Sequence, residues 1–573
     1  MPDTVKLAEY LFTRLKQLGI EAVHGVPGDF NLVLLDYVEP AGLQWVGNAN
    51  ELNAGYAADG YARIKGVGAL ITTFGVGELS AINAIAGAYA ERAAVVHIVG
   101  TPDRPTQDGR VQVHHTFNDG EFGRFAQMAA HVTVAQVDLK DPRTSPEHID
   151  HALTQCLLHS RPVYIQVPVD MVSAPVSAAR LQSELRLPSP APTAYSDEVI
   201  ENVLERIYEA KQPTILVDGE TRAFGIVDLV QRLVEVTGWP SWTTMFGWGL
   251  LDETTPNVHG IYRGSFDTTG TVAVAQASDL ILCFGPHFST TNSFSKTSIP
   301  KVEATIYITH NEIRIGHQIF RDIPARFAVA QILEKLDPAK ATSYTPSTDL
   351  SRPLVDTYSE ALKDQPITQA LFWPMVSKIV QAGDIILGET GSAAHGCRLM
   401  SLPKHVRTFL PATWLSIGYM LGATQGAALA QRELMTRSQY HGIQRARTTL
   451  FIGDGSFQMS AQELGTIIRH NLNVTIVLIN NDGYTIERVI HGLKQGYNDV
   501  AAWNYLQAPG FFGAKGDTFT AKVKTLGELR DVLDSGELGK AEGLKMVEVV
   551  MDREDVPEGP LTWLLQKQLE TLN

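Results

Sequence analysis

The chain has 573 residues, of which 44% are hydrophobic and 19% are charged. This length and apolar content suit three ordinary globular domains with substantial cores. The formal net charge of −15 argues against nucleic acid and anionic membranes as partners, because both attract a basic face. The sequence contains no run of about twenty apolar residues, so we expect no membrane span and no membrane partner.

The cysteines and the amino-terminal residues indicate the cellular compartment of the protein. Cys156, Cys283 and Cys397 are too few and too scattered for a disulfide framework or a zinc site. A secretory leader has a basic segment followed by an apolar one, and no such pattern precedes Val5. We therefore expect a cytoplasmic protein in a reducing environment.

The first third of the chain alternates predicted helices and strands. A first helix is expected at 5–18, where Gly19 would end it. It is followed by a strand at 69–73, a Gly75-Val76-Gly77 turn, a helix at 80–90 and a strand at 94–99. This alternation predicts a parallel sheet that is covered by helices.

The same order returns near the other end of the chain. It consists of a strand at 448–452, a Gly453-Asp454-Gly455 turn, a helix at 461–470 and a strand at 474–479. The two glycine turns are 453 − 75 = 378 residues apart. We predict two doubly wound α/β domains of one topology. Only the second has an aspartate between its glycines, since Val76 takes that place in the first.

A third unit is expected between these two. Pro188, Pro190 and Pro192 mark one stiff linker, and a polar stretch at 337–353 marks another. Between the linkers, apolar strands at 214–217 and 279–284 again indicate an α/β domain. The prediction is three doubly wound α/β domains with mainly parallel sheets, at 1–182, 195–340 and 355–573.

The Gly453-Asp454-Gly455 run has the residue types of a metal and diphosphate cradle. Glycines let backbone N–H groups approach an anion closely, and Asp454 and Asn481 offer the hard oxygen ligands that Mg²⁺ or Ca²⁺ prefers. Alone, such a run is usually a tight turn. Here a hydrophobic strand and Asn480-Asn481 follow it, and the spacing of 481 − 453 = 28 residues resembles the thiamine diphosphate signature.

The earlier run, Gly75-Val76-Gly77, also fits the start of a dinucleotide-binding fold, in which a strand, G-x-G and a helix follow one another. Ser80 stands where the third glycine or alanine of that fingerprint belongs, and the acidic residue after the next strand is at best Asp103. The alternative is that these glycines simply permit close packing of helix on sheet.

Taken together, several motifs resemble thiamine diphosphate-dependent 2-oxo acid decarboxylases of the pyruvate decarboxylase and indolepyruvate decarboxylase type. The resemblance covers essentially the whole chain and rests on residues 25–31, 50–63, 72–80, 114–115, 389–391 and 480–487. It implies thiamine diphosphate and Mg²⁺ as cofactors and a small-molecule 2-oxo acid as substrate. It also implies a homodimer at least, with a homotetramer expected.

The resemblance further implies a role for each motif residue. Asp454, Asn481 and the Gly483 carbonyl would hold Mg²⁺, while Glu51 would reach the cofactor's aminopyrimidine from another subunit. Ile417 would be the apolar wedge that bends the cofactor. The other implied cofactor-binding residues are Thr390, Gly453, Gly455 and Ser456. The implied acid–base set is Asp29, His114, His115 and Glu487.

The substrate pocket is expected at Thr390, Ala394, Ile486 and Ile490. Ile486 and Ile490 resemble the isoleucines that narrow the pocket of pyruvate-preferring enzymes, although their spacing also suits ordinary helix packing. Ala394 leaves room beside Thr390. We expect non-oxidative decarboxylation of pyruvate to acetaldehyde and CO₂, with phenylpyruvate, indolepyruvate or a branched-chain 2-oxo acid as alternative substrates.

Other function classes fit this sequence less well. A carboligase of the acetolactate synthase type shares Glu51 and the metal motif, but it lacks the His114-His115 pair and typically holds FAD in its middle domain. No dinucleotide fingerprint occurs in the middle of this chain. A transketolase places its metal-binding domain first, whereas here it comes last. A catalytically inert binding or filament protein is also disfavoured, because the chain contains every polar residue that catalysis would be expected to require.

Overall fold

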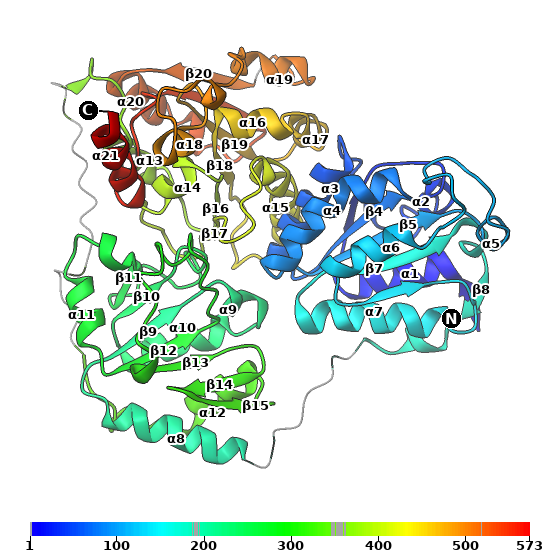
Figure 1. Ribbon diagram of the computed structural model, residues 1–573, viewed down its shortest axis with the longest axis horizontal. Helices are drawn as coiled ribbons and strands as arrows, with labels where there is room; N and C mark the ends of the chain where they lie inside the picture. Colours follow the sequence, from blue (N-terminus) through cyan, green and yellow to red (C-terminus); the bar gives the residue numbers. More distant parts are fainter. Residues whose placement is uncertain are drawn as a thin grey trace.

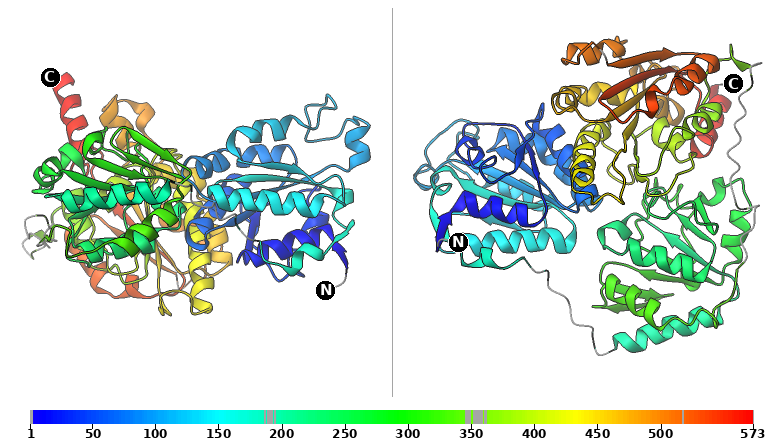
Figure 2. Two further views of the ribbon diagram at one scale, coloured as in Figure 1. Left: turned by 90° about the horizontal axis from the view of Figure 1, so that it is seen from below. Right: turned by 180° about the vertical axis from the view of Figure 1, so that it is seen from behind.

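The computed structural model describes residues 3–572, except 186, 188–192, 194, 345–349, 351–358, 360–361 and 517. Three α/β domains follow one another along the chain. Figure 1 shows the first in blue and cyan, the second in green and the third in yellow to red. Seen from behind in Figure 2, the third domain lies beside both of the others. The linker prolines 188, 190 and 192, part of the stretch at 337–353 and the predicted boundary at 355 lie outside the described residues.

The first domain is built on a six-stranded parallel sheet of order β3-β2-β4-β5-β7-β6. Its strands are β2 (Ala22–Gly25), β3 (Gln44–Trp45), β4 (Gly68–Thr73), β5 (Val95–Thr101), β6 (Gln136–Asp138) and β7 (Val163–Pro168). Its helices are α1 (Leu7–Gln17), α2 (Leu32–Leu35), α3 (Glu51–Lys65), α4 (Val76–Ala90), α5 (Arg104–Asp108), α6 (Arg124–Ala129) and α7 (Ser145–His159). Every residue of β4 and β5 is buried, because helices cover both faces of the sheet.

The third domain repeats this topology with a parallel sheet of order β17-β16-β18-β19-β21-β20. In both sheets the strands lie in the succession second, first, third, fourth, sixth, fifth, so the predicted repeat is confirmed. The strands are β16 (Ile385–Gly388), β17 (Arg407–Phe409), β18 (Thr448–Gly453), β19 (Val474–Asn480), β20 (Phe519–Val523) and β21 (Leu544–Val550). The helices are α13 (Gln369–Ser377), α14 (Ser392–Cys397), α15 (Tyr419–Thr436), α16 (Asp454–Ser460), α17 (Glu463–Arg469), α18 (Thr485–Ile490), α19 (Ala508–Phe511), α20 (Leu526–Asp534) and α21 (Pro560–Leu572).

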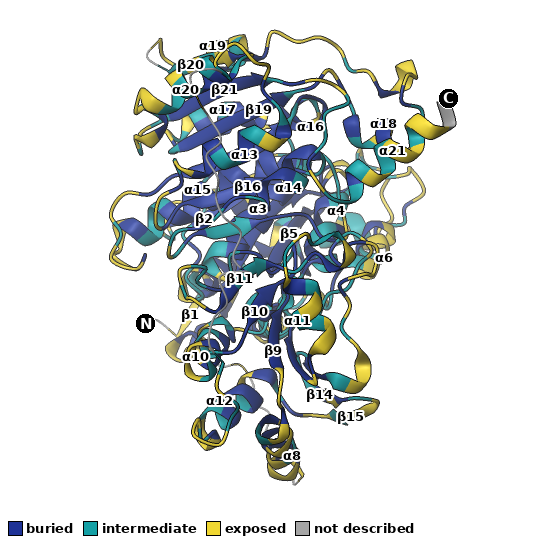
Figure 3. Ribbon diagram, turned by 90° about the vertical axis from the view of Figure 1, so that its left-hand side faces the viewer, coloured by how far each residue is buried: buried dark blue, intermediate teal, exposed yellow. Residues whose placement is uncertain are grey.

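The middle domain has a seven-stranded sheet of order β11-β10-β9-β12-β13-β14-β15, which is parallel except that β14 is antiparallel to both of its neighbours. Its strands are β9 (Pro213–Val217), β10 (Ser241–Thr243), β11 (Val258–Ile261), β12 (Leu280–Phe284), β13 (Thr305–Ile308), β14 (Glu312–Ile315) and β15 (Gln318–Arg321). Its helices are α8 (Ser196–Glu209), α9 (Glu220–Ala223), α10 (Val227–Thr237), α11 (Thr271–Ala277) and α12 (Ala325–Lys335). Figure 3 shows the strands of the domains mostly buried, with the exposed residues on outer helices and loops.

Observed elements differ from the expected ones mainly at their ends. The expected helix at 5–18 is α1, and Val5 instead lies in β1 (Thr4–Lys6), which pairs antiparallel with β8 (Pro175–Ser177). The helix expected from Ser80 is α4, which begins at Val76. It starts earlier because the Glu78 carboxylate accepts the Gly75 N–H at 2.8 Å and so caps the first turn.

Helices α3 and α15 hold the first and third domains together. A Cβ on Gly60 would lie 2.2 Å from the Ala423 carbonyl oxygen, and one on Gly426 would lie 1.8 Å from the Ala57 carbonyl oxygen. The two backbones approach so closely that only glycine fits at these points. The first and third domains therefore form one tightly packed unit within the chain.

Glu91 lies where the three domains meet. One of its carboxylate oxygens accepts the backbone N–H groups of Ala412 and Thr413 at 3.0 and 2.9 Å, and the other pairs with Arg63 at 3.0 Å. The neighbouring Arg92 pairs with Glu220 of the middle domain at 2.8 Å. The end of α4 is thus bound to both of the other domains.

Among the described residues, no helix is both long enough and apolar enough to span a membrane.

Candidate active site

A cavity of about 200 Å³ lies at the carboxyl ends of β16, β18 and β19 in the third domain. In doubly wound folds, ligands bind at this edge of the sheet. Its lining residues are Thr390, Gly391, Ser392, Ile417, Gly453, Asp454, Gly455, Ser456, Asn481, Gly483, Tyr484, Thr485, Ile486 and Glu487. Every cofactor-binding residue predicted in the third domain is therefore brought to one cavity.

Asp454 lines this cavity from the first position of α16 and is 1% exposed. Its carboxylate accepts the Gly455 N–H at 2.8 Å and the Gly483 N–H at 3.0 Å. Burial raises the pKa of Asp454 to about 6. Gly483 has φ +125, and a Cβ there would lie 2.3 Å from the Asn498 carbonyl oxygen, so no larger residue fits. The expected turn at 453–455 is thus the junction of β18 and α16.

The two asparagines at the end of β19 point in different directions. Asn480 donates to Glu548 at 2.8 Å and so faces away, whereas Asn481 lines the cavity. The buried Arg488 donates to the backbone carbonyls of Asn481 and Asp482, at 3.4 and 2.5 Å, and holds this turn in place. Arg488 was not among the residues predicted from the sequence. Its position seven residues after Asn481, within the helix that follows the asparagines, was the available signal.

These residues fit a metal ion with a diphosphate. The Asp454 carboxylate, the Asn481 amide and the Gly483 carbonyl are hard oxygen donors, which suit Mg²⁺. Gly453 adds open space, because a Cβ built there would meet no described atom within 4 Å. A phosphate group can therefore approach the backbone at the start of α16 without a steric clash.

Glu389 lies next to the lining residue Thr390, behind the surface of the cavity. It is fully buried, and its carboxylate accepts the backbone N–H groups of Thr390, Gly418 and Met420 at 2.7, 3.1 and 2.9 Å. Burial raises its pKa to about 7. These bonds tie the end of β16 to the loop that carries Ile417. The sequence indicates Glu389 only as part of the 389–391 motif, because nothing in it shows which N–H groups the carboxylate would meet.

The predicted acid–base residues of the first domain gather in a separate cluster. Asp29, His114 and His115 place their side-chain ligand atoms within 4.8 Å of one another. His114 Nε2 lies 2.5 Å from one Asp29 carboxylate oxygen, and His115 Nε2 lies 3.9 Å from the other. The Phe30 ring stacks on His114 with centroids 5.0 Å apart. A proton can pass between Asp29 and His114 along this contact.

Glu51 is the first residue of α3, whose N-cap Asn50 accepts the Asn53 N–H at 2.8 Å. Its carboxylate lies against Gly77, where a Cβ would be 3.2 Å from Glu51 Oε1. A Cβ on Gly75 would lie only 2.1 Å from the His115 carbonyl oxygen. Both glycines of the first turn therefore make room for candidate site residues, which supports the close-packing interpretation over a dinucleotide site.

The structure thus assembles the predicted site in two parts. No described residue of the first domain lines the cavity of the third, so Asp29, Glu51, His114 and His115 stay apart from Asp454 and Glu487 within the chain. In the predicted substrate pocket, Thr390 and Ile486 line the cavity. Ala394 instead packs in the core beside Gly388, and Ile490 is 51% exposed.

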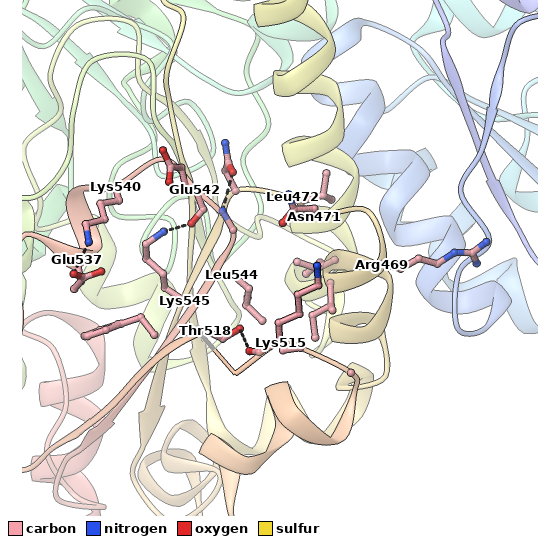
Figure 4. Close-up of a pocket in the computed structure, with 17 residues that line it drawn as sticks. Arg469, Asn471, Leu472, Lys515, Thr518, Glu537, Lys540, Glu542, Leu544 and Lys545 are labelled. Carbon is pink, nitrogen blue, oxygen red and sulfur yellow. Dashed lines mark hydrogen bonds and ion pairs between the residues drawn. The ribbon is translucent and has the colours of Figure 1, made fainter.

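A larger cavity lies elsewhere. It has a volume of about 930 Å³ and lies at the amino ends of β19, β20 and β21, on the edge of the sheet opposite the candidate site (Figure 4). Lys540, Lys545 and Glu542 are among its lining residues. It contains none of the predicted site residues.

Comparison with protein families matches all three domains. The thiamine pyrophosphate enzyme N-terminal TPP binding domain matches residues 5–125, the central domain matches 200–336, and the C-terminal TPP binding domain matches 389–549. The fold and the cavity therefore belong to a thiamine diphosphate-dependent enzyme. This finding removes the dinucleotide alternative for the first domain.

Relatives match along the whole chain. A pyruvate decarboxylase of Aspergillus parasiticus is 52% identical over 573 residues, which cover 99% of this chain and 98% of that protein. Pyruvate decarboxylase isozyme 1 of Saccharomyces cerevisiae is 36% identical and covers 97% of each chain. The structure of a Rhodococcus jostii thiamine diphosphate-dependent 4-hydroxybenzoylformate decarboxylase has the same fold, with a TM-score of 0.76 at 19% identity over 96% of this chain and 99% of that one. The chain belongs to the thiamine diphosphate-dependent 2-oxo acid decarboxylases of the pyruvate decarboxylase type.

Proposed function

We propose that this protein decarboxylates pyruvate to acetaldehyde and CO₂, with thiamine diphosphate and Mg²⁺ as cofactors. The observation that carries the proposal is the 52% identity, over all three domains, with the Aspergillus parasiticus protein named pyruvate decarboxylase. Relatives of the same name from Aspergillus fumigatus and Aspergillus terreus are 42% and 41% identical. Phenylpyruvate, indolepyruvate and branched-chain 2-oxo acids are the alternative substrates, and a carboligase reaction ranks below them.

The third domain would hold the cofactor. We assign Mg²⁺ to Asp454, Asn481 and the Gly483 carbonyl, which are hard oxygen donors around one cavity. Thr390, Ile417, Gly453, Gly455 and Ser456 complete the assigned cofactor wall. When bound, thiamine diphosphate supplies the nucleophilic carbon and the electron sink for the loss of CO₂. Glu389 positions the Ile417 loop through three backbone N–H groups.

The first domain, together with Glu487 of the third, would move protons. We assign Glu51 to hold the proton that is exchanged with the cofactor's aminopyrimidine. We assign Asp29, His114, His115 and Glu487 to proton transfer at the substrate. The 2.5 Å contact between Asp29 and His114 supports this role, since a positioned acid–base pair can donate a proton after CO₂ has left. Water must be excluded around these groups, because loss of CO₂ neutralises charge and is faster in a dry site.

The two-part arrangement leads to a proposed assembly. Because the acid–base cluster and the cofactor cavity do not meet within one chain, we propose that two chains complete each site, in a homodimer or a homotetramer. We further propose a cytoplasmic location and domain boundaries at 1–182, 195–340 and 355–573.

A panel of substrates tests the function. We expect kcat/KM with thiamine diphosphate and Mg²⁺ to be highest for pyruvate, and lower for phenylpyruvate, indolepyruvate and a branched-chain 2-oxo acid, because specificity is a ratio of these values. A higher value for an aromatic acid would move the assignment to the alternative substrates. Formation of acetolactate instead of acetaldehyde would favour the carboligase.

A further inference from the structure

A cavity of about 530 Å³ lies between the middle and third domains, away from the candidate active site. Its middle-domain wall includes Trp248, His259 and Arg263, and its third-domain wall includes Pro374, Arg398 and Glu558. None of its lining residues belongs to the cavity that contains Asp454. Its volume is within the range of about 300–1,000 Å³ that is typical of small-molecule sites.

Arg263 is the unusual residue of this cavity. It is 2% exposed, yet its Nε and Nη1 atoms have no hydrogen-bond partner among the described residues. Its nearest carboxylate, that of Asp267, lies 3.8 Å from Nε, beyond hydrogen-bonding distance. Asp267 uses its other oxygen to accept the N–H and hydroxyl of Thr269, at 2.9 and 2.6 Å. A guanidinium held this way is costly to bury unless an acceptor reaches it from the cavity.

The backbone fixes Arg263 in this position. It lies two residues after the end of β11 and precedes Gly264, which has φ +56. A Cβ on Gly264 would lie 2.4 Å from the Thr297 hydroxyl, so the turn is closely packed. The Arg263 side chain therefore cannot reach solvent by a small backbone shift.

The other titratable groups that line the cavity are those of Arg398, His259, Glu253 and Glu558, and the two glutamates bring negative charge. Arg398 is also 2% exposed, but it lies over the Phe294 ring at 4.7 Å and donates to the Glu558 carbonyl at 3.1 Å. Burial lowers the pKa of His259 to about 4, so its imidazole is neutral. The Glu253 carboxylate accepts the Leu402 N–H at 3.1 Å. Arg398 thus adds positive potential, while Arg263 has donors left for a ligand.

We propose that this cavity binds a small oxyanion, a carboxylate or a phosphate, through the Arg263 guanidinium. The planar guanidinium donors match the two oxygens of a carboxylate or of a phosphate face. The indole of Trp248 and the ring of Pro374 can contact a small organic body beside the anionic group. In the larger cavity of Figure 4, by contrast, Lys540 pairs with Glu537 at 2.5 Å and Lys545 donates to the Glu542 carbonyl at 2.5 Å.

Calorimetric titration tests this site. The full-length protein is saturated with thiamine diphosphate and Mg²⁺, so that the diphosphate site is filled, and is titrated separately with inorganic phosphate and with acetate. We expect one site per chain with a Kd on the order of 1 mM for at least one of the two anions. Binding of phosphate alone indicates a phosphorylated ligand, and binding of acetate alone indicates a carboxylate.

Variants separate this site from the others. Arg263→Gln is expected to remove that one equivalent of binding while kcat with saturating pyruvate is retained, and Arg263→Lys is expected to weaken binding at least about tenfold. Arg232→Gln, which changes an exposed arginine of the same domain, should bind as the wild type does. If the wild-type protein binds neither phosphate nor acetate, the proposal is overturned, even if Arg263→Gln fails to fold. Unchanged binding by the Arg263 variants would also overturn it.

Discussion

At the scale of the residue, the proposed metal site rests on a single buried carboxylate. Asp454 is held by the Gly455 and Gly483 N–H groups, and no described basic side chain forms an ion pair with it. Backbone N–H groups orient the carboxylate but leave its negative charge in place. An Mg²⁺ ion is the partner that such a carboxylate lacks.

Asp454→Asn is expected to weaken Mg²⁺-dependent thiamine diphosphate binding by about a hundredfold or more, because the charged oxygen ligand is lost. Calorimetry with and without Mg²⁺ measures the effect. Asp482→Asn is the matched control, since Asp482 lies in the facing loop but its side chain pairs with Arg553. If Asp454→Asn and the wild type bind thiamine diphosphate with equal affinity in the presence of Mg²⁺, Asp454 is not a ligand of the metal.

Glu78 supplies a prediction about pH. It is 3% exposed, and burial raises its pKa from 4.5 to about 7 although Gly75 and Tyr164 donate to it. Because the folded state binds this proton more tightly than the unfolded state does, Glu78 contributes a fall in the free energy of unfolding as pH rises from 4.5 to 7, and the buried Glu389 adds to that fall. Glu78→Gln should remove the share due to Glu78, which amounts to about 3 kcal/mol. Denaturant unfolding at several pH values measures it.

The control for this experiment is Glu147→Gln, which replaces an exposed carboxylate of α7. Its pH dependence of stability should match that of the wild type. If Glu78→Gln keeps the full slope between pH 4.5 and 7, then another buried group is responsible for it.

At the scale of the element, the contact between α3 and α15 depends on glycine. A Cβ on Gly426 would lie 1.8 Å from a backbone oxygen of α3, and backbone cannot move aside as a flexible side chain does. We expect Gly426→Ala to lower the free energy of unfolding by about 3 kcal/mol through overpacking. Gly465→Ala in α17, where the nearest atom would be 3.8 Å away, should be neutral or stabilising. Similar stabilities for the two variants would show that this contact tolerates a methyl group.

Much of the element pattern could be predicted from the sequence. The strands expected at 448–452 and 474–479 match β18 and β19 closely, because apolar runs bounded by glycine or asparagine mark buried parallel strands. The pairing of β1 with β8 could not be predicted, since it joins segments about 170 residues apart and has no local signal. The early start of α4 could not be predicted either. Gly75-Val76-Gly77 indicates a turn, and the sequence does not show that the Glu78 side chain caps a helix that begins at Val76.

At the scale of the whole molecule, the repeated topology was predictable but the placement of site residues was only partly so. The spacing of 28 residues between Gly453 and Asn481 located the cavity, because the two ends of adjacent parallel strands meet at one sheet edge. Ala394 and Ile490 were chosen by local spacing, and tertiary packing placed them outside that cavity. Glu389 and Arg488 act on backbone groups that only the folded chain brings near them.

The proposed assembly predicts complementation between inactive variants. Glu51→Gln and Asp454→Asn should each abolish decarboxylation on their own. If each site draws Glu51 from one chain and Asp454 from the other, co-expression of the two variants restores one intact site in every mixed dimer. Activity of the purified mixture measures this. Inactivity of a mixture shown to contain mixed dimers would place both residues of a site in one chain.

Acetaldehyde formation tests the central claim most directly. The purified protein, freed of cofactor, is given pyruvate with and without thiamine diphosphate and Mg²⁺, and acetaldehyde is measured over time. We predict rapid formation only when both cofactors are present, and none with Glu51→Gln under the same conditions. Absence of acetaldehyde from the fully supplied wild-type protein, or an undiminished rate with Glu51→Gln, would contradict the account.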